Sequence, residues 1–281
     1  MVFAVRAVKS ANRENPDEMA HLRSTVMGYI IQAACGCHRG LRRRKNEDNF
    51  YFDGKCLEQQ NNGLKNPAYL EEPLKNGTFY AVFDGMGGEN FGEIASYAAA
   101  RQMQQSQRKL ADFLVSEKKY LERLVEQLND AVTQAQKELL TDRMGSTMVG
   151  LYFSGRYVYV CNVGDSRAYR LRAGEFLQIS TDHTEKIPTV ENQKAPLSQY
   201  LGFDSEEIQL DPYIAKGRME DGDLYLLCSD GLTDMLSNFE IADIMLSCED
   251  VELCVRKLID KALEQGGRDN ITVVVCKVIE R

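Results

Sequence analysis

Between Gly145 and Ser180 the sequence consists of short apolar segments separated by connections that each contain a glycine. β-Branched and aromatic residues are frequent in these segments, which predicts strands over Ser146–Phe153, Tyr157–Val163, Arg167–Leu171 and Phe176–Ser180. Connections this short join antiparallel strands, whereas parallel neighbours need a crossover of about a dozen residues or more. The chain is therefore expected to form antiparallel meanders.

Two long helical patterns precede this region, over about Phe91–Phe113 and Glu117–Leu140. In the second pattern, apolar residues recur every three or four positions and should share one buried face: Leu121, Leu124, Leu128, Val132, Ala135 and Leu139. We expect both helices to lie against a sheet.

Further strands are expected on both sides of these helices, over Tyr29–Cys35, Asp48–Phe52, Thr78–Phe83, Leu224–Cys228 and Ile271–Val278. The second and third of them should be neighbours, with a loop over Leu57–Gly77 between them. Thr181–Asp221 is interpreted as irregular, and shorter helices are expected near Phe239–Leu246 and Val251–Leu263. This order of elements favours an α+β layered sandwich over alternating βαβ units.

The length of 281 residues is compatible with one large domain or with two. No internal repeat is found, and no strand or helix pattern is completed before Met27. We expect residues 1–26 to be a flexible N-terminal tail and residues 27–281 to form a single domain.

The chain has 34 basic and 42 acidic residues, which gives a net charge of −8. This balance disfavours a protein that binds the phosphate backbone of nucleic acids. The longest stretch without a charge, Ser24–Cys37, is shorter than the roughly 20 apolar residues of a membrane-spanning helix, and no signal peptide is recognisable. We expect no membrane span and a cytoplasmic location, with the 8 cysteines reduced.

Aspartates occur three times where an apolar strand meets glycine, at Asp84, Asp230 and Asp269. A single Asp-Gly pair commonly forms a turn. Repeated at three strand ends, carboxylates beside glycines suit hard divalent cations such as Mg²⁺ or Mn²⁺. Histidines are too few, at 3, to favour a histidine-rich zinc site.

The order of short motifs along the chain resembles that of the metal-dependent (type 2C) protein phosphatases, with an Asp-Gly-Met-Gly-Gly form similar to that of the bacterial branch. The matching segments are Arg43–Asp48, Phe83–Gly88 with Gly92-Glu93, Gly145–Thr147, Asn162–Tyr169, Thr181–His183, Cys228–Asp234 and Gly267–Thr272. The resemblance implies a four-layer α-β-β-α sandwich of two antiparallel sheets flanked by helices. It also implies hydrolysis of phosphoserine and phosphothreonine on proteins.

The resemblance assigns metal ligands residue by residue. Asp84 matches the carboxylate that bridges two Mn²⁺ or Mg²⁺ ions, and Gly85 matches the residue that offers its carbonyl oxygen. Asp230 and Asp269 match ligands of one ion. Two such ions acidify a shared water and offset the charge of an in-line transition state.

Four further positions carry roles over from the family. Glu47 and Asp48 match carboxylates that hold metal-bound water, and Asp165 matches the position that, with Asp230, holds a weaker third ion. Arg43 matches the phosphate-binding arginine, whose fork can orient a phosphate through two hydrogen bonds.

The family also suggests partners, namely phosphoproteins and a cognate Ser/Thr kinase, and we expect a monomer. The chain departs from the family pattern at two places. Glu89 stands where bacterial members often have histidine, and the segment Thr184–Tyr200 is shorter than the usual flap.

Two alternatives remain open at this stage. Cys37 and Arg43 have the Cys-x₅-Arg spacing of cysteine-dependent phosphatases, which need a reactive thiolate at the head of a phosphate-binding loop. The other alternative is a catalytically silent module of the same fold that binds phosphoproteins.

Overall fold

The computed structural model describes residues 28–75, 77–87, 91–106, 115–141, 143–185, 195–203 and 210–281. Within these ranges every strand pairing is antiparallel, and the strands form two six-stranded sheets. The first sheet has the order β3 (Ala68–Pro73), β1 (Tyr29–His38), β12 (Ile271–Glu280), β11 (Leu224–Cys228), β8 (Arg167–Arg172) and β9 (Glu175–Gln178). The second has the order β10 (Tyr213–Arg218), β7 (Tyr157–Val163), β6 (Met148–Ser154), β4 (Thr78–Met86) and β2 (Asp48–Tyr51), and β5 (Gly145–Ser146) pairs with β4.

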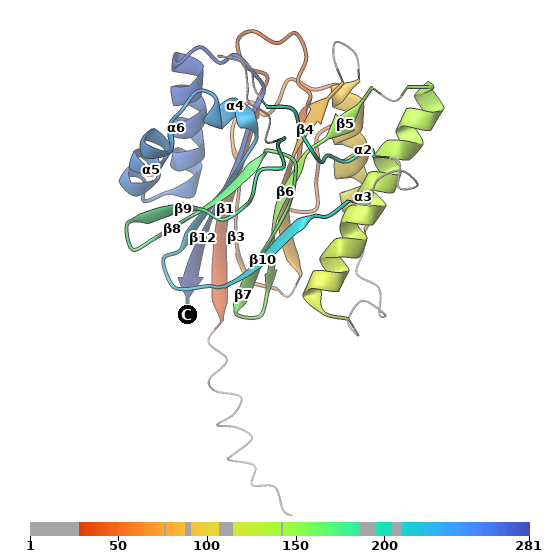
Figure 1. The fold of residues 1–281 in the computed structure, drawn as a ribbon. Helices are drawn as coiled ribbons and strands as arrows, with labels where there is room; N and C mark the ends of the chain where they lie inside the picture. Colours follow the sequence, from red (N-terminus) through yellow and green to blue (C-terminus); the bar gives the residue numbers. More distant parts are fainter. Residues whose placement is uncertain are drawn as a thin grey trace, which may run out of the picture.

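Helices cover the outer face of each sheet (Figure 1). The second sheet packs on α2 (Gly92–Gln105) and α3 (Glu117–Leu139), and the first packs on α4 (Asp230–Thr233), α5 (Asn238–Ser247) and α6 (Val251–Glu264). A third apolar core lies between the sheets, where Ile31 and Val274 of the first sheet share a cluster with Val82 and Leu151 of the second. The expected four-layer α-β-β-α sandwich is confirmed.

The second long helix forms almost where the apolar spacing placed it. Ser116 caps α3 by accepting a hydrogen bond from the backbone of Lys119, and Leu140 ends it in the left-handed conformation with φ 52°. The predicted face is buried from Leu121 to Val132, but Leu139 is 42% exposed, so the prediction was wrong at that position. The first helix is described over Gly92–Gln105, and residues 107–113 of the expected Phe91–Phe113 lie outside the described ranges.

Strands β3 and β10 fall in segments that the sequence analysis interpreted as a loop and as irregular. Each is an edge strand, β3 of the first sheet and β10 of the second. Their residues are at most half-buried, because an edge strand has a neighbour on one side only. The apolar alternation that marks a strand is correspondingly weak there.

The chain changes sheets between β7 and β8. The hairpins β6–β7 and β8–β9 form as expected, as does the neighbouring pair β2 and β4. The Gly164-Asp165 connection does not close a hairpin, since β7 pairs with β6 and β10 while β8 pairs with β11 and β9. This crossing brings Asp165 to the end of the sandwich where both sheets meet.

The predicted N-terminal tail, residues 1–26, lies outside the described residues, so its dispensability stays a prediction. Among the residues that are described, no helix combines the length and the apolar character needed to cross a membrane.

Candidate metal centre

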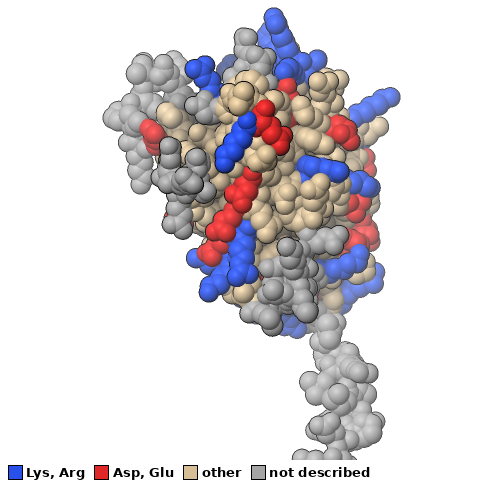
Figure 2. All heavy atoms as spheres, turned by 90° about the vertical axis from the view of Figure 1, so that its right-hand side faces the viewer, with Lys and Arg blue, Asp and Glu red and all other residues tan. Residues whose placement is uncertain are grey.

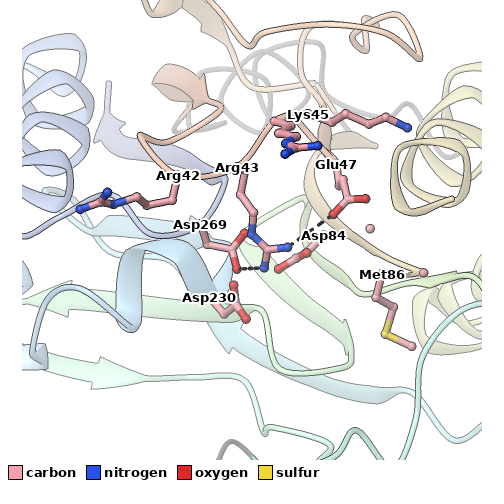
Figure 3. Close-up of a pocket in the computed structure, with 11 residues that line it drawn as sticks. Arg42, Arg43, Lys45, Glu47, Asp84, Met86, Asp230 and Asp269 are labelled. Atoms are coloured by element: carbon pink, nitrogen blue, oxygen red, sulfur yellow. Dashed lines mark hydrogen bonds and ion pairs between the residues drawn. The ribbon is translucent and has the colours of Figure 1, made fainter. Parts of the chain in front are cut away.

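A cavity of about 880 Å³ opens at the end of the sandwich where β4 terminates and α4 begins. Segments far apart in the sequence contribute to it: the β1–β2 loop, the end of β4, the start of α4 and the loop before β12 (Figure 3). It is lined by Arg42, Arg43, Arg44, Lys45, Glu47, Asp84, Gly85, Met86, Gly87, Asp230 and Asp269. The fold thus brings the three strand-end aspartates to one place, as the sequence predicts.

Asp84 stands at the centre of the negative charge. Its backbone is held on both sides by Thr147, whose hydroxyl accepts from the Asp84 N–H at 3.1 Å and whose N–H donates to the Asp84 carbonyl at 2.8 Å. Burial raises the pKa of Asp84 well above its usual range, and the nearby carboxylates of Asp230, Asp48, Asp165 and Asp269 raise it further. A cation at this point would offset that repulsion.

Asp48 lies opposite Asp84 in the β2–β4 ladder and is buried. Its Oδ2 accepts hydrogen bonds from the hydroxyls of Ser229 and Thr272, each at 2.7 Å. Its Oδ1 is buried with no hydrogen-bond partner in the described part of the chain. Burial raises the pKa of Asp48 to about 7, although the two hydroxyls act in the opposite direction. An unpartnered carboxylate oxygen at this depth is a ready donor to a cation or its water.

Arg43 and Arg42 point in different directions, although they are neighbours in the basic run. The Arg43 guanidinium contacts Asp269 Oδ2 at 2.6 Å and lies 3.9 Å from Glu47 Oε2. Arg42 turns away from the carboxylates (Figure 3). Of the two, only Arg43 is aimed at the aspartates.

Gly85 is required where the end of β4 passes the start of α2. A Cβ at this position would overlap the carbonyl oxygen of Gly92 and lie 2.5 Å from that of Glu47. The Gly85 N–H donates to the Glu47 carbonyl at 3.0 Å, so the absence of a side chain lets the β1–β2 loop lie directly on β4.

Asn270 is a site residue that the sequence analysis did not single out. Its Oδ1 accepts from the Glu47 N–H at 2.7 Å, and its Nδ2 donates to the carbonyls of Arg39 and Lys45 at 2.8 and 2.9 Å. One buried side chain therefore holds both ends of the loop that carries Arg43. The sequence feature that could have identified Asn270 is its position next to Asp269, in a motif that matches the family.

We expect Asn270→Ala to lower the free energy of unfolding by at least about 2 kcal/mol, since three backbone groups lose their partner. The hydrolysis of a phosphothreonine peptide that the family resemblance implies should fall about 10- to 100-fold, as is typical when a group that supports a metal site is removed. Urea denaturation and steady-state kinetics measure the two effects. The exposed Gln265→Ala, on the same loop, is the control. An Asn270→Ala protein as stable and active as this control would show that Asn270 does not hold the loop in place.

Asp165 lies beside the cavity, at the crossing between the sheets, and is 8% exposed. The turn before it is held by His183. The ring Nδ1 of His183 accepts a hydrogen bond from the Gly164 N–H at 3.2 Å, and the backbone N–H of His183 donates to the Gly164 carbonyl at 2.9 Å. Partial burial lowers the pKa of His183, which favours the neutral ring that can accept this bond.

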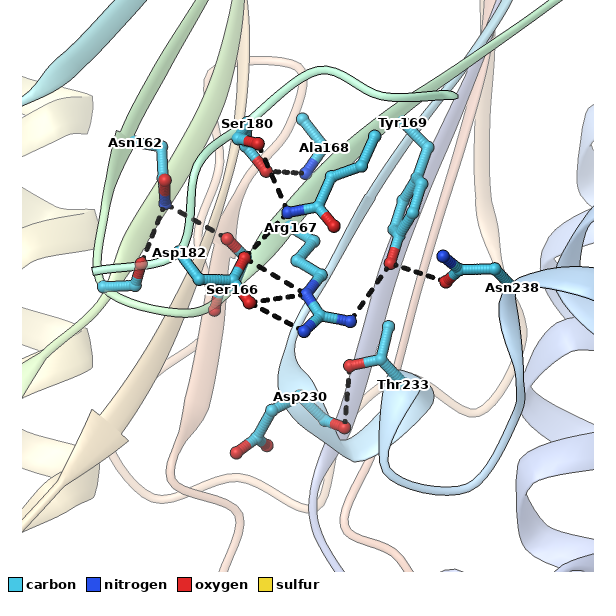
Figure 4. A network of polar contacts seen from close by, with 12 residues as sticks. Asn162, Ser166, Arg167, Ala168, Tyr169, Ser180, Asp182, Asp230, Thr233 and Asn238 are labelled. Carbon is cyan, nitrogen blue, oxygen red and sulfur yellow. Dashed lines mark hydrogen bonds and ion pairs between the residues drawn. The ribbon is translucent and has the colours of Figure 1, made fainter. Parts of the chain in front are cut away.

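A polar network supports the neighbouring region (Figure 4). Arg167 binds the carboxylate of Asp182 through Nε and Nη2, at 2.9 and 2.6 Å to Oδ2. It also donates to the Tyr169 hydroxyl at 3.4 Å, which in turn donates to Asn238 at 3.1 Å. The network links β8 and the segment after β9 to the start of α5. Asp230 lies close to the network but points away from Arg167 (Figure 4).

The donor set fits hard divalent cations. It consists of carboxylate oxygens, with the Gly85 carbonyl beside them, and the described residues that line the cavity include no histidine or cysteine. Within the described residues, no three Asp, Glu, His or Cys side chains are grouped tightly enough to hold an ion as they stand. Arg43 lies between Asp269 and Glu47 and supplies positive charge to the cluster.

Cys37 does not have the surroundings of a nucleophile. It lies in β1 with 1% exposure, and burial raises the pKa of its thiol to about 12. Its sulfur accepts hydrogen bonds from Asn46 and Thr272, each at 3.1 Å, away from the cavity lining. The structure therefore gives no support to a cysteine-dependent phosphatase. Glu89 and residues 186–194 of the Thr184–Tyr200 segment lie outside the described residues.

Comparisons with known proteins identify the family and the fold. The family model described as Protein phosphatase 2C matches residues 68–264. Serine/threonine phosphatase stp of Listeria welshimeri is 31% identical over 252 residues, which cover 84% of this chain and 92% of that protein. Serine/threonine protein phosphatase PstP of Mycobacterium tuberculosis is 30% identical over 262 residues, 89% of this chain. The chain spans about half of that relative, 46% of its length.

Solved structures show the same fold. The crystal structure of Mycobacterium tuberculosis PstP has a TM-score of 0.70 at 29% identity and covers 90% of this chain and 100% of that one. PppA of Pseudomonas aeruginosa has a TM-score of 0.71 at 27% identity, covering 89% of this chain and 100% of that one. The PstP catalytic domain solved in complex with 2 manganese ions has a TM-score of 0.69 at 29% identity, covering 89% and 99%.

Proposed function

The chain belongs to the protein phosphatase 2C family and is a homologue of bacterial serine/threonine protein phosphatases, and we propose that it hydrolyses phosphoserine and phosphothreonine on proteins in a metal-dependent reaction. The observation that carries this proposal is the arrangement of Asp84, Asp230, Asp269 and Glu47 around one cavity with an arginine among them.

In this proposal Asp84, Asp230 and Asp269 hold two Mn²⁺ or Mg²⁺ ions together with the Gly85 carbonyl. The two manganese ions of the PstP complex support this number and this metal. When bound, such ions acidify water and offset the charge of a phosphoryl group in transfer. Asp165 and Asp230 are proposed to take a weaker third ion.

Glu47 and Asp48 are proposed to act from the β2 side of the cavity. The buried, unpartnered Oδ1 of Asp48 can accept a hydrogen bond from water, while Ser229 and Thr272 fix its other oxygen. Glu47 is held by its backbone to Asn270 and Gly85. These contacts support a role for both carboxylates in orienting a water molecule.

Arg43 is proposed to bind the phosphoryl group. Its guanidinium already engages a carboxylate oxygen, Asp269 Oδ2, and phosphate oxygens offer the same acceptor chemistry. Because Arg43 is 48% exposed at the mouth of the cavity, it can reach a phosphate that enters from solvent.

The test is steady-state hydrolysis of phosphoserine, phosphothreonine and phosphotyrosine peptides with Mn²⁺, and again after removal of the metal with a chelator. We expect turnover of the first two peptides and loss of that turnover with chelator. Binding without turnover would favour the silent phosphoprotein-binding module. Turnover that persists in chelator would contradict the metal site. A cognate Ser/Thr kinase and a monomeric state remain predictions from the sequence and the family.

A further inference from the structure

The loop between β1 and β2 is strongly basic in a protein whose net charge is −8. From His38 to Asn46 it contains no acidic residue, and its cations are Arg39, Arg42, Arg43, Arg44 and Lys45. On the face covered by α2 and α3, by contrast, basic and acidic side chains are interspersed (Figure 2). The basic loop therefore differs in charge from that face.

Two cations of this loop have no ion-pair partner among the residues that the structure describes. Arg43 pairs with Asp269, and Lys45 pairs with Glu93 at 2.5 Å. Arg42 and Arg44 are exposed, and neither guanidinium makes an ion pair or a hydrogen bond to any residue that the structure describes. Both nevertheless line the cavity. We call Arg42 and Arg44 the outer arginines.

The backbone that carries the outer arginines is held in place. The Leu41 N–H donates to the Gly267 carbonyl at 2.7 Å, and Asn270 binds the carbonyls of Arg39 and Lys45. Gly40 adopts φ 79°, where a Cβ would overlap the Asp269 carbonyl oxygen. The two guanidiniums therefore extend from a fixed backbone on either side of Arg43.

We propose that the outer arginines select phosphorylation sites that have a second anionic group close to the phosphorylated residue, either an acidic side chain or another phosphate. This inference rests on the proposed function, because it names the substrate class of that same cavity. When Arg43 holds the phosphoryl group, neighbouring residues of the substrate pass over Arg42 and Arg44. Carboxylates and phosphates are the partners that a guanidinium pairs with most effectively.

The test compares phosphothreonine peptides that differ only in the residues flanking the phosphothreonine: alanines, aspartates, lysines, or a second phosphothreonine. We expect kcat/KM at low salt to be about five- to twentyfold higher for the aspartate-flanked peptide than for the alanine-flanked one. The ratio should decrease as salt rises, since the Debye length falls from about 10 Å at 0.1 M to about 3 Å at 1 M.

Variants connect the preference to the two side chains. The double variant Arg42→Ala/Arg44→Ala should lose most of the ratio between aspartate- and alanine-flanked peptides. Arg42→Glu/Arg44→Glu should instead prefer the lysine-flanked peptide. Arg156→Ala is the matched control, because this exposed arginine is in the turn between β6 and β7, outside the cavity lining.

The outcomes separate this inference from the function on which it rests. No hydrolysis of any peptide, or of p-nitrophenyl phosphate, would contradict the proposed function itself. Hydrolysis with equal kcat/KM for all flanks, or a preference that survives the double variant, overturns the role of the outer arginines. A preference for the doubly phosphorylated peptide alone would support the inference and identify phosphate as the second anion.

Discussion

Asp84→Asn is expected to lower kcat/KM on a phosphothreonine peptide at saturating Mn²⁺ by more than about 100-fold. Changes to groups that merely support metal ligands typically cost about 10- to 100-fold, and in the proposed site Asp84 is the ligand shared by both ions. Asparagine keeps the shape of the side chain and removes the charge. Steady-state kinetics on the purified variant measures the effect.

The same substitution should stabilise the metal-free protein. Asp84 is half-buried and lies near the carboxylates of Asp48, Asp165, Asp230 and Asp269, so a neutral side chain relieves repulsion among like charges. The wild-type protein should gain thermal stability when Mn²⁺ is added, because a ligand of the folded state stabilises it, and the variant should gain less.

Thermal unfolding with and without Mn²⁺ checks both statements, with the exposed Asp243→Asn as the control for loss of one charge. Near-normal turnover of Asp84→Asn, together with an undiminished gain of thermal stability in Mn²⁺, would contradict the two-metal assignment.

Arg43→Ala is expected to lose about 10- to 150-fold in kcat/KM, the equivalent of about 1.5–3 kcal/mol for hydrogen bonds to a charged group. The measurement uses the alanine-flanked phosphothreonine peptide at saturating Mn²⁺, so that the outer arginines contribute little. Arg43→Lys should fall between Arg43→Ala and the wild type, since lysine retains the charge but not the two-donor fork.

Arg42→Ala on the same peptide should cost little, because Arg42 turns away from the carboxylates (Figure 3). Metal affinity should stay near normal in all of these variants, as no cationic side chain is a ligand. Equal small effects of alanine at positions 42 and 43 would show that the basic run is a solvated surface and that another residue binds the phosphate.

Much of the fold could be predicted because most strands are buried on both faces. β7 and β11 have the predicted ends, and α3 differs from the prediction by one residue. The missed strands β3 and β10 are edges, where burial no longer imposes an apolar pattern. The sheet change at Gly164-Asp165 was also missed, because a short glycine connection permits a hairpin and a crossing alike.

The residues of the candidate site also differ in how well they could be predicted from the sequence. Asp84, Asp230 and Asp269 could be found because each follows or precedes an apolar strand beside glycine. Asn270 and His183 act by hydrogen bonds to backbone groups of other loops, namely Glu47 and Gly164. Any residue offers the same backbone groups, whatever its side chain. The sequence therefore shows Asn270 and His183 but not the backbone groups that they bind.

The order in which the chain is synthesised makes completion of the first sheet depend on β12. β12, the last strand, lies between β1 and β11 in the first sheet, and the segment that leads into it supplies Asp269. The contact between Arg43 and Asp269 spans 226 positions, and that between Asp48 and Thr272 spans 224. Because a contact cannot form before both residues have left the ribosome, a nascent chain ending before Ile271 has an open sheet and no assembled cavity. The cavity would then be completed in one step, once β12 has left the ribosome and has paired with both β1 and β11.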